Sequence, residues 1–231
     1  MNYVFAPAPS VSVPVVGTEA LFPVHRIYCV ARNFEDHAKE MGQAGREPPF
    51  FFMKPADAVL VVRSGDTAAL PYPSLTSNLH HEIELVVAIG LGGKNITVEE
   101  AEKHILGYAV GLDMTRRDLQ NAMKAQGRPW CIGKGFDHSA PIGPITLADD
   151  VPHIQQATIS LSVNGVQRQH SQVNQMIWNV AETIAQLSNA WELQAGDLIY
   201  TGTPAGVGAV VPGDSLNGSI SGLSTIELKV S

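Results

Sequence analysis

The chain has 231 residues, enough for one large domain or two small ones. It carries 15 lysines and arginines against 22 aspartates and glutamates, so its formal net charge is −7, and it contains no basic block. Nucleic-acid binding is therefore not expected, because that function depends on lysine and arginine neutralising phosphates. Charged residues make up 16% and apolar residues 45% of the chain, a balance that supplies a sizeable core and excludes a disordered protein.

The sequence also indicates a cellular location. No apolar run reaches the roughly 18–20 residues needed to cross a bilayer, and the N-terminal segment lacks the positive charge of a secretory signal. Two cysteines, Cys29 and Cys131, provide neither a disulfide framework nor a zinc knuckle. We expect a soluble cytoplasmic protein that binds neither a membrane nor nucleic acid.

The first half of the chain predicts short strands separated by turns. Residues 1–20 are rich in proline and valine and indicate an N-terminal arm or edge strand, ahead of one domain over residues 21–231. Glu100 follows Thr97 by three residues, which predicts a capping box and a helix of about two turns. Strands are expected at residues 25–31, 50–55, 82–90 and 108–115, and glycine-terminated helices at 34–42 and 116–127.

The second half continues this mixture. Asn164-Gly165 is a hairpin-turn signal, and apolar residues recur at helical spacing over 175–190. Strands outnumber helices and do not alternate with them in βα units, which favours a β-rich α+β fold with a few short helices. Further strands are expected at residues 157–163, at the start of 196–208 ahead of a glycine-rich loop, and at 225–230.

Three carboxylates are expected at strand ends. Glu82 and Glu84 alternate along one predicted strand, so their side chains share a face, and Asp113 ends the next apolar strand. Neighbouring carboxylates repel each other, and three of them form an all-oxygen site that suits Mg²⁺ or Mn²⁺. The alternative interpretation is a solvated strand face. His80 shares the glutamate face by the same parity, and we expect it and His81 to support the site rather than to bind the ion.

A histidine and a glutamate form the second candidate group. His37 and Glu40 are three residues apart on a predicted helix, so they lie on one face. A glutamate beside a histidine fixes the imidazole tautomer and raises its basicity, as a general base requires. The alternative is an ordinary surface pair.

Basic and hydroxyl side chains form the remaining groups. Arg117 and Gln120 follow Asp113 closely, and Lys134 lies between two glycines in an apolar stretch. Cations near an acid cluster can bind anionic groups or stabilise a developing oxyanion, although they can also simply balance charge. Thr203 lies in a glycine-rich loop at a strand end, which can bind a carboxylate or serve as a tight turn.

Six blocks, in this order, resemble the fumarylacetoacetate hydrolase family and together cover nearly the whole chain. They are RNFEDHAKEM (32–41), FMKP (52–55), HHEIEL (80–85), GLDMTRRDLQ (111–120), RPWCIGKGFD (128–137) and GDLIYTGTPAGVG (196–208).

The resemblance implies a β-rich roll of mixed sheets, a homodimer and a divalent cation, Mg²⁺ or Mn²⁺, with Ca²⁺ also open. In this family Glu82, Glu84 and Asp113 would be the metal ligands. His37 and Glu40 would activate water from a segment that orders as a lid over the substrate. Lys134 would stabilise the oxyanion, and the substrate would be bound by Arg32, Asn33, Arg117, Gln120 and Thr203.

Within the family, residues 46–59, 77–90 and 113–118 resemble the branch that hydrolyses 3-fumarylpyruvate to fumarate and pyruvate in gentisate degradation. The resemblance therefore implies a small-molecule acylpyruvate substrate and cleavage of a carbon–carbon bond. Relatives of the same fold decarboxylate oxaloacetate or isomerise dienes, so these activities are the alternatives. A metal-binding scaffold without activity is a further alternative, and it would tolerate loss of His37.

Overall fold

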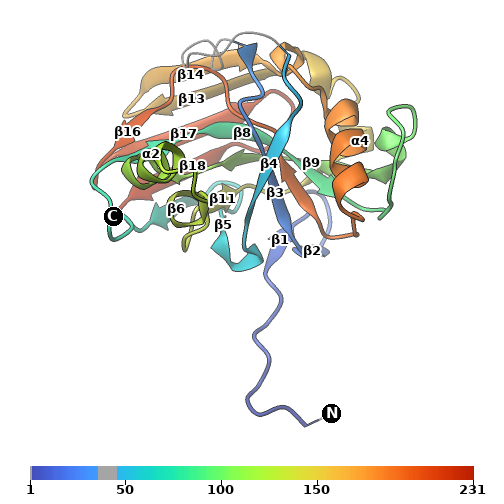
Figure 1. Cartoon of the computed structure of the whole chain (residues 1–231), viewed down its shortest axis with the longest axis horizontal. Helices are drawn as coiled ribbons and strands as arrows, with labels where there is room; N and C mark the ends of the chain where they lie inside the picture. The colour runs from blue at the N-terminus through green and yellow to red at the C-terminus, as the bar shows by residue number, and fades with distance from the viewer. Residues whose placement is uncertain (1, 36–45) are drawn as a thin grey trace.

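In the computed structural model, which describes residues 2–35 and 46–231, β-strands dominate and the helices are short. The strands curl around a buried centre, with α4 (Val180–Ala190) and α2 (Arg117–Ala125) on opposite sides (Figure 1). The predicted β-rich α+β fold is confirmed. The largest sheet runs in the spatial order β4 (Phe50–Lys54), β3 (Ile27–Ala31), β15 (Leu198–Tyr200), β8 (Ile83–Ile89), β9 (Ile105–Leu112), β11 (Ala140–Ile142) and β5 (Val59–Val61), with β12 (Thr146–Leu147) paired to β9.

Smaller sheets complete the roll. The second sheet runs in the order β14 (Val166–Gln172), β13 (Thr158–Val163), β17 (Ser215–Ile220), β18 (Ile226–Val230) and β6 (Thr67–Leu70). The others are β10 (Thr115–Arg116), β7 (Leu79–His81) and β16 (Gly208–Val210), and the pair β1 (Ser12–Pro14) and β2 (Leu21–Pro23).

The helices are short, and α4 buries Ile184 and Leu187 in the core between the two large sheets. Among the described residues, none is both long and apolar enough to span a membrane. Besides α2 and α4 they are α3 (Cys131–Lys134) and the 3₁₀ turns η1 (Ala56–Ala58), η2 (Ala101–His104), η3 (Ala148–Asp150), η4 (Ile154–Gln156) and η5 (Val173–Gln175).

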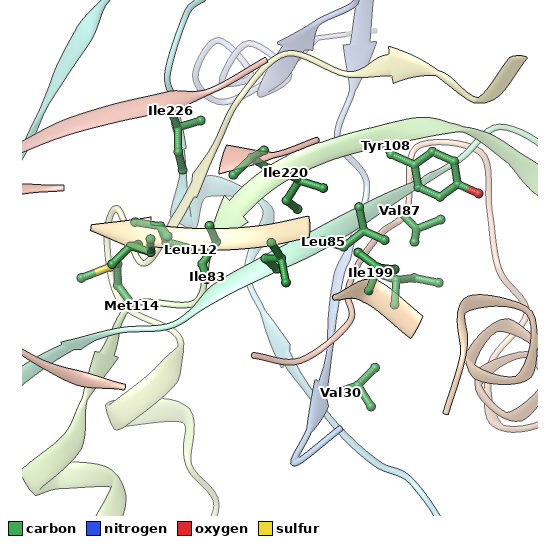
Figure 2. Close-up of a cluster of buried hydrophobic side chains, with 14 of the residues drawn as sticks. Val30, Ile83, Leu85, Val87, Tyr108, Leu112, Met114, Ile199, Ile220 and Ile226 are labelled. Atoms are coloured by element: carbon green, nitrogen blue, oxygen red, sulfur yellow. The ribbon is translucent and has the colours of Figure 1, made fainter. Parts of the chain in front are cut away.

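Strand β8 lies between two apolar cores, which explains its unbroken apolar sequence. Ile83 faces the core shared with the second sheet, where Figure 2 shows it beside Leu112, its partner on β9. Val86 and Ala88 face the opposite core, which β1 and β2 also cover. Glu84 lies on the side of Val86 and Ala88, because strand residues alternate between faces. The fold therefore places a carboxylate at the end of a strand that is buried on both sides.

Turn signals read from the sequence are confirmed. Asn164 and Gly165 adopt left-handed backbone angles, with φ of 52° and 76°, in the tight connection between β13 and β14. Gly127 has φ of +62° just beyond α2, a conformation that glycine adopts without strain.

The predicted capping box at Thr97 is wrong. The chain makes only the one-turn η2, and no side chain caps its N-terminus. Ile105 already begins β9, which pairs with β8 along its length. Ahead of η2 the Glu100 amide donates to the Thr97 carbonyl at 3.2 Å and the Ala101 amide to the Val98 carbonyl at 3.4 Å, so the segment forms tight three-residue turns and not an α-helix.

The predicted helix over 175–190 starts too early. Helix α4 begins after Asn179, whose side chain accepts from the Glu182 amide at 2.9 Å while Glu182 accepts from the Asn179 amide at 3.1 Å. Before this cap, the Ile177 amide donates to the Asn33 carbonyl at 2.8 Å. These backbone groups are used to hold the segment around Asn33 and are not available to a helix. The predicted helix over 34–42 falls almost entirely outside the described residues.

Candidate active site

The three predicted acids meet where β8 and β9 pair. Glu82 directly precedes β8, Glu84 is its second residue, and Asp113 directly follows β9. The Asp113 amide donates to the Glu82 carbonyl at 2.8 Å, so the strand register brings the acids together. One oxygen from each carboxylate lies within 4.8 Å of the other two, and all three side chains are buried. Three buried hard oxygen donors fit a divalent cation.

Glu84 lies in an unfavourable environment for a negative charge. Burial, followed by the charges of Asp113 and Glu82, raises the pKa of Glu84 well above its usual value. The Gly202 amide donates to Glu84 Oε2 at 2.9 Å and opposes this shift. Gly202 has φ of +97°, and a Cβ there would lie 2.7 Å from Asn33 Cβ. Glycine is therefore required where the loop turns its amide toward the acid.

Cations from α2 and α3 balance the acids. Lys134 Nζ lies 2.7 Å from Glu82 Oε2, 2.5 Å from Asp113 Oδ2 and 2.7 Å from Thr115 Oγ1. Burial alone would lower the pKa of Lys134, but the carboxylates of Asp113 and Glu82 outweigh it and raise the pKa above its usual value. The Arg117 guanidinium pairs with Glu82. The site is thus an alternating cluster of acids and cations.

A pocket of about 460 Å³, including space open to solvent, lies over this cluster. Arg117 Nη1 donates to Gln120 Oε1 at 2.5 Å, so the two side chains reach the pocket as one unit. The pocket is lined by eight predicted site residues, Arg32, Glu82, Glu84, Asp113, Arg117, Gln120, Lys134 and Thr203, and by Val30, Ala31, Phe52, Lys124 and Trp130.

Asn33 is not among the lining residues. Its amide nitrogen donates to the Thr201 and Trp178 carbonyls at 2.8 and 2.9 Å, and its oxygen accepts from the Trp178 amide at 2.8 Å. The side chain ties two loops together beside the pocket. His37 and Glu40, together with the expected lid, lie outside the described residues.

Thr203 is held by groups from both large sheets. Its hydroxyl donates to the Ile83 carbonyl at 2.8 Å and accepts from Gln169 Nε2 at 2.8 Å. Gln169 Oε1 accepts from the Ile83 amide at 3.1 Å and lies 2.9 Å from His81 Nδ1. Sequence reasoning missed Gln169, because only the packing of β14 over β8 brings it here.

His80 supports Arg117 from outside the pocket. Arg117 Nε donates to His80 Nδ1 at 3.5 Å, and His80 Nε2 lies 2.9 Å from Asn78 Oδ1. Since a guanidinium can only donate, the His80 proton is on Nε2. Burial, followed by the charge of Arg117, lowers the pKa of His80 to about 4. His80 is therefore a neutral acceptor, in the supporting role that strand parity suggested.

Lys54 is the second buried polar residue beside the acids that the sequence reasoning missed. It ends β4 with its ammonium buried, 2.8 Å from Asp113 Oδ1. The available signal was a lysine closing the apolar run FFFM, where a charged side chain needs a buried partner.

Comparison with known proteins agrees with this geometry. The Fumarylacetoacetate (FAA) hydrolase C-terminal family model matches residues 26–231. The chain belongs to the fumarylacetoacetate hydrolase family, as the six sequence blocks indicated.

Three proteins with named activities are similar to this chain over most of its length. A fumarylpyruvate hydrolase of Ralstonia is 48% identical over 80% of this chain and 93% of its own length. An oxaloacetate tautomerase of Escherichia coli is 43% identical over 88% of this chain and 91% of its own length. The crystal structure of a fumarylpyruvate hydrolase from Pseudomonas aeruginosa, in complex with Mn²⁺ and pyruvate, has a TM-score of 0.97 and 56% identity, covering 99% of each chain.

Proposed function

We propose that the chain is a metal-dependent acylpyruvate hydrolase that converts 3-fumarylpyruvate and water to fumarate and pyruvate. The observation that carries the proposal is the buried triad of Glu82, Glu84 and Asp113 beneath a pocket lined by Arg117 and Lys134. Two fumarylpyruvate hydrolases at 48% and 56% identity support the choice of substrate. A substrate with a carboxylate at each end also suits a pocket rich in cations.

The triad is the proposed site of Mn²⁺ or Mg²⁺. Bound there, the cation would act as a Lewis acid on the 2-oxo acid group of the substrate. The relative from Pseudomonas aeruginosa was crystallised with Mn²⁺, which supports the choice of ion. Carboxylate triads also accept Ca²⁺, so a comparison of the three ions belongs in the assay.

The side chains around the triad have separate tasks. Arg117, held by Gln120 and His80, would bind a substrate carboxylate. Lys134 is a protonated, buried donor and would stabilise the oxyanion that forms at the attacked carbonyl. We assign His37, oriented by Glu40, as the base that takes a proton from water, an assignment that rests on the sequence.

We further infer a homodimer that acts in the cytoplasm, in the gentisate branch of aromatic degradation. Family resemblance supports the dimer and the pathway. Cys29 and Cys131 are both free thiols, which is usual in a reducing compartment. Light scattering on the purified protein would measure its oligomeric state.

Conversion of oxaloacetate is the second candidate function, favoured by the tautomerase at 43% identity. Purified protein should be assayed with 3-fumarylpyruvate and with oxaloacetate, each with Mn²⁺, Mg²⁺, Ca²⁺ or EDTA. We expect equimolar fumarate and pyruvate, and loss of turnover in EDTA. Turnover of oxaloacetate with fumarylpyruvate left intact would favour the second candidate.

A variant that removes the negative charge of one proposed ligand tests whether the measured activity comes from this site or from a contaminating enzyme. Glu84→Gln should lose more activity than the roughly 10–100-fold typical of an altered outer-shell partner, because it removes a ligand. Glu192→Gln, at an exposed position, is the matched control and should retain full activity. Equal activity of the two variants at limiting metal would contradict the proposed metal site.

A further inference from the structure

The contacts of the buried Lys54 support an inference that goes beyond the proposed reaction. Its side chain is fully buried at the end of β4, where its ammonium forms an ion pair with a carboxylate and donates to two backbone carbonyls. Nζ lies 2.8 Å from Asp113 Oδ1 and 3.2 Å from the Met114 carbonyl oxygen, and it also donates to the Lys134 carbonyl oxygen. A buried ammonium is costly unless it is paired, so the ion pair and the two hydrogen bonds of Lys54 point to a defined task.

The two oxygens of Asp113 are divided between two lysines. Lys54 holds Oδ1, whereas Oδ2 lies 2.5 Å from Lys134 Nζ. The same Lys134 ammonium lies 2.7 Å from Glu82 Oε2, so Oδ2 is the oxygen on the side of the acid cluster. The ion pair of Oδ1 with Lys54 therefore favours the orientation in which Oδ2 is turned toward the other acids.

Lys54 also fixes the helix that presents Lys134. Helix α3 has four residues and ends at Lys134, and its last carbonyl accepts the bond from Lys54. The Met114 carbonyl, one residue beyond Asp113, accepts the second hydrogen bond from Lys54. A single ammonium therefore sets the positions of one proposed metal ligand and of the lysine beside it.

We propose that Lys54 is a positioning residue of the metal site, which pre-assembles Asp113 and Lys134 for the ion. The inference rests on the proposed metal site at Glu82, Glu84 and Asp113. A purely structural lysine would affect folding alone, whereas a positioning residue sets the affinity for the ion. Outer-shell partners of metal ligands act in this way elsewhere.

The test is a Mn²⁺ titration of purified full-length variants, in which electron paramagnetic resonance measures the free ion. Lys54→Met keeps the length of the side chain but has no charge and no donors. We expect its Kd for Mn²⁺ to rise by roughly 10–100-fold. Lys103→Met removes a lysine whose side chain is 69% exposed, and as the matched control it should bind Mn²⁺ like the wild-type chain.

Each outcome has a distinct meaning. A folded Lys54→Met variant with wild-type Mn²⁺ affinity would overturn the positioning role and leave the proposed function intact. A wild-type chain that does not bind Mn²⁺ would overturn the proposed metal site itself. If Lys54→Met does not fold, a crystal structure of the wild-type chain with Mn²⁺ decides. Lys54 should remain on Asp113 Oδ1 with the ion on Oδ2, and an ion bound to Oδ1 would refute the inference.

Discussion

At the scale of single residues, the site is a set of charges that constrain one another. Glu82 interacts with Arg117 and Lys134, and Asp113 interacts with Lys134 and Lys54. Replacing any of these side chains by an uncharged one would leave the charge of its buried partner uncompensated. A single substitution here therefore removes one side chain and also changes the protonation and position of its neighbours.

Strand parity and strand ends were sufficient to predict the acid cluster from sequence. Glu82 and Glu84 are two residues apart, and Asp113 ends the next strand, so local patterns brought them to one place. Lys54 and Gln169 could not be predicted in this way. Their roles depend on contacts with residues 59 and 34 positions away in the sequence, Asp113 and Thr203.

The proposed base and its partner should behave as a unit. His37→Ala is expected to lower kcat by roughly 10²–10⁴, the usual contribution of a positioned general base. Glu40→Gln should lose much of the same factor, and the double variant should be little worse than His37→Ala. Steady-state kinetics with 3-fumarylpyruvate measures all three variants.

Binding of oxalate provides the control for this prediction. Oxalate resembles the 2-oxo acid group and reports on the metal pocket, so its affinity should change little in the His37→Ala variant. Losses that multiply in the double variant would instead show that His37 and Glu40 act independently.

His80 gives the chain a defined sensitivity to acid. Its pKa is about 4 in the folded protein, below the ordinary value of 6.5, so the unfolded chain takes up the proton first. The free energy of unfolding should therefore fall as the pH drops from 6.5 to about 4. His80→Gln should reduce this loss.

Urea unfolding at neutral pH and near pH 5 measures the effect of His80. His153→Gln, which alters an exposed histidine, should leave the wild-type pH dependence unchanged. An identical pH dependence in His80→Gln would show that other groups cause the acid sensitivity.

At the scale of elements, local signals located most strands and turns but not how strands pair. Strand β15 pairs in parallel with β3 and antiparallel with β8. Nothing in the sequence of residues 198–200 specifies these neighbours, because the partners are far apart in the chain. The helix predicted over 175–190 begins too early for the same reason, because the Ile177 amide bonds to the distant Asn33 carbonyl.

Helix α4 offers a prediction at this scale. The Asn179 side chain caps the helix and forms a reciprocal pair with Glu182. Asn179→Ala should lower the free energy of unfolding by about 1 kcal/mol, the typical cost of losing a cap. Chemical denaturation measures it.

Asn174→Ala is the matched control for the cap. Asn174 is exposed in η5, outside α4, and its replacement should have little effect on stability. Equal stability of the two variants would show that tertiary packing, rather than the cap, determines where α4 begins.

At the scale of the whole molecule, two apolar cores meet at the strand that carries the acids. The core between the two large sheets and the core beneath β1 and β2 cover both faces of β8. Within the described residues of the site, three acids are opposed by three cations, Lys54, Arg117 and Lys134. The fold therefore has compensated charges before any ion is added.

This balance predicts how removal of the ion affects the protein. The chain should remain folded in EDTA and lose activity, because packing of the two cores does not depend on the ion. Mn²⁺ at 100 times its Kd should stabilise the folded state by about 2.7 kcal/mol. For a chain of this size that corresponds to a rise in Tm of about 5–10 °C. Differential scanning calorimetry in EDTA and in Mn²⁺ measures both states.

Asp113→Asn should unfold at the same temperature in either solution, because it lacks one proposed ligand. Cooperative unfolding of the wild-type chain by EDTA at room temperature would instead mean that the ion, and not the buried lysines and arginine, holds the three acids together.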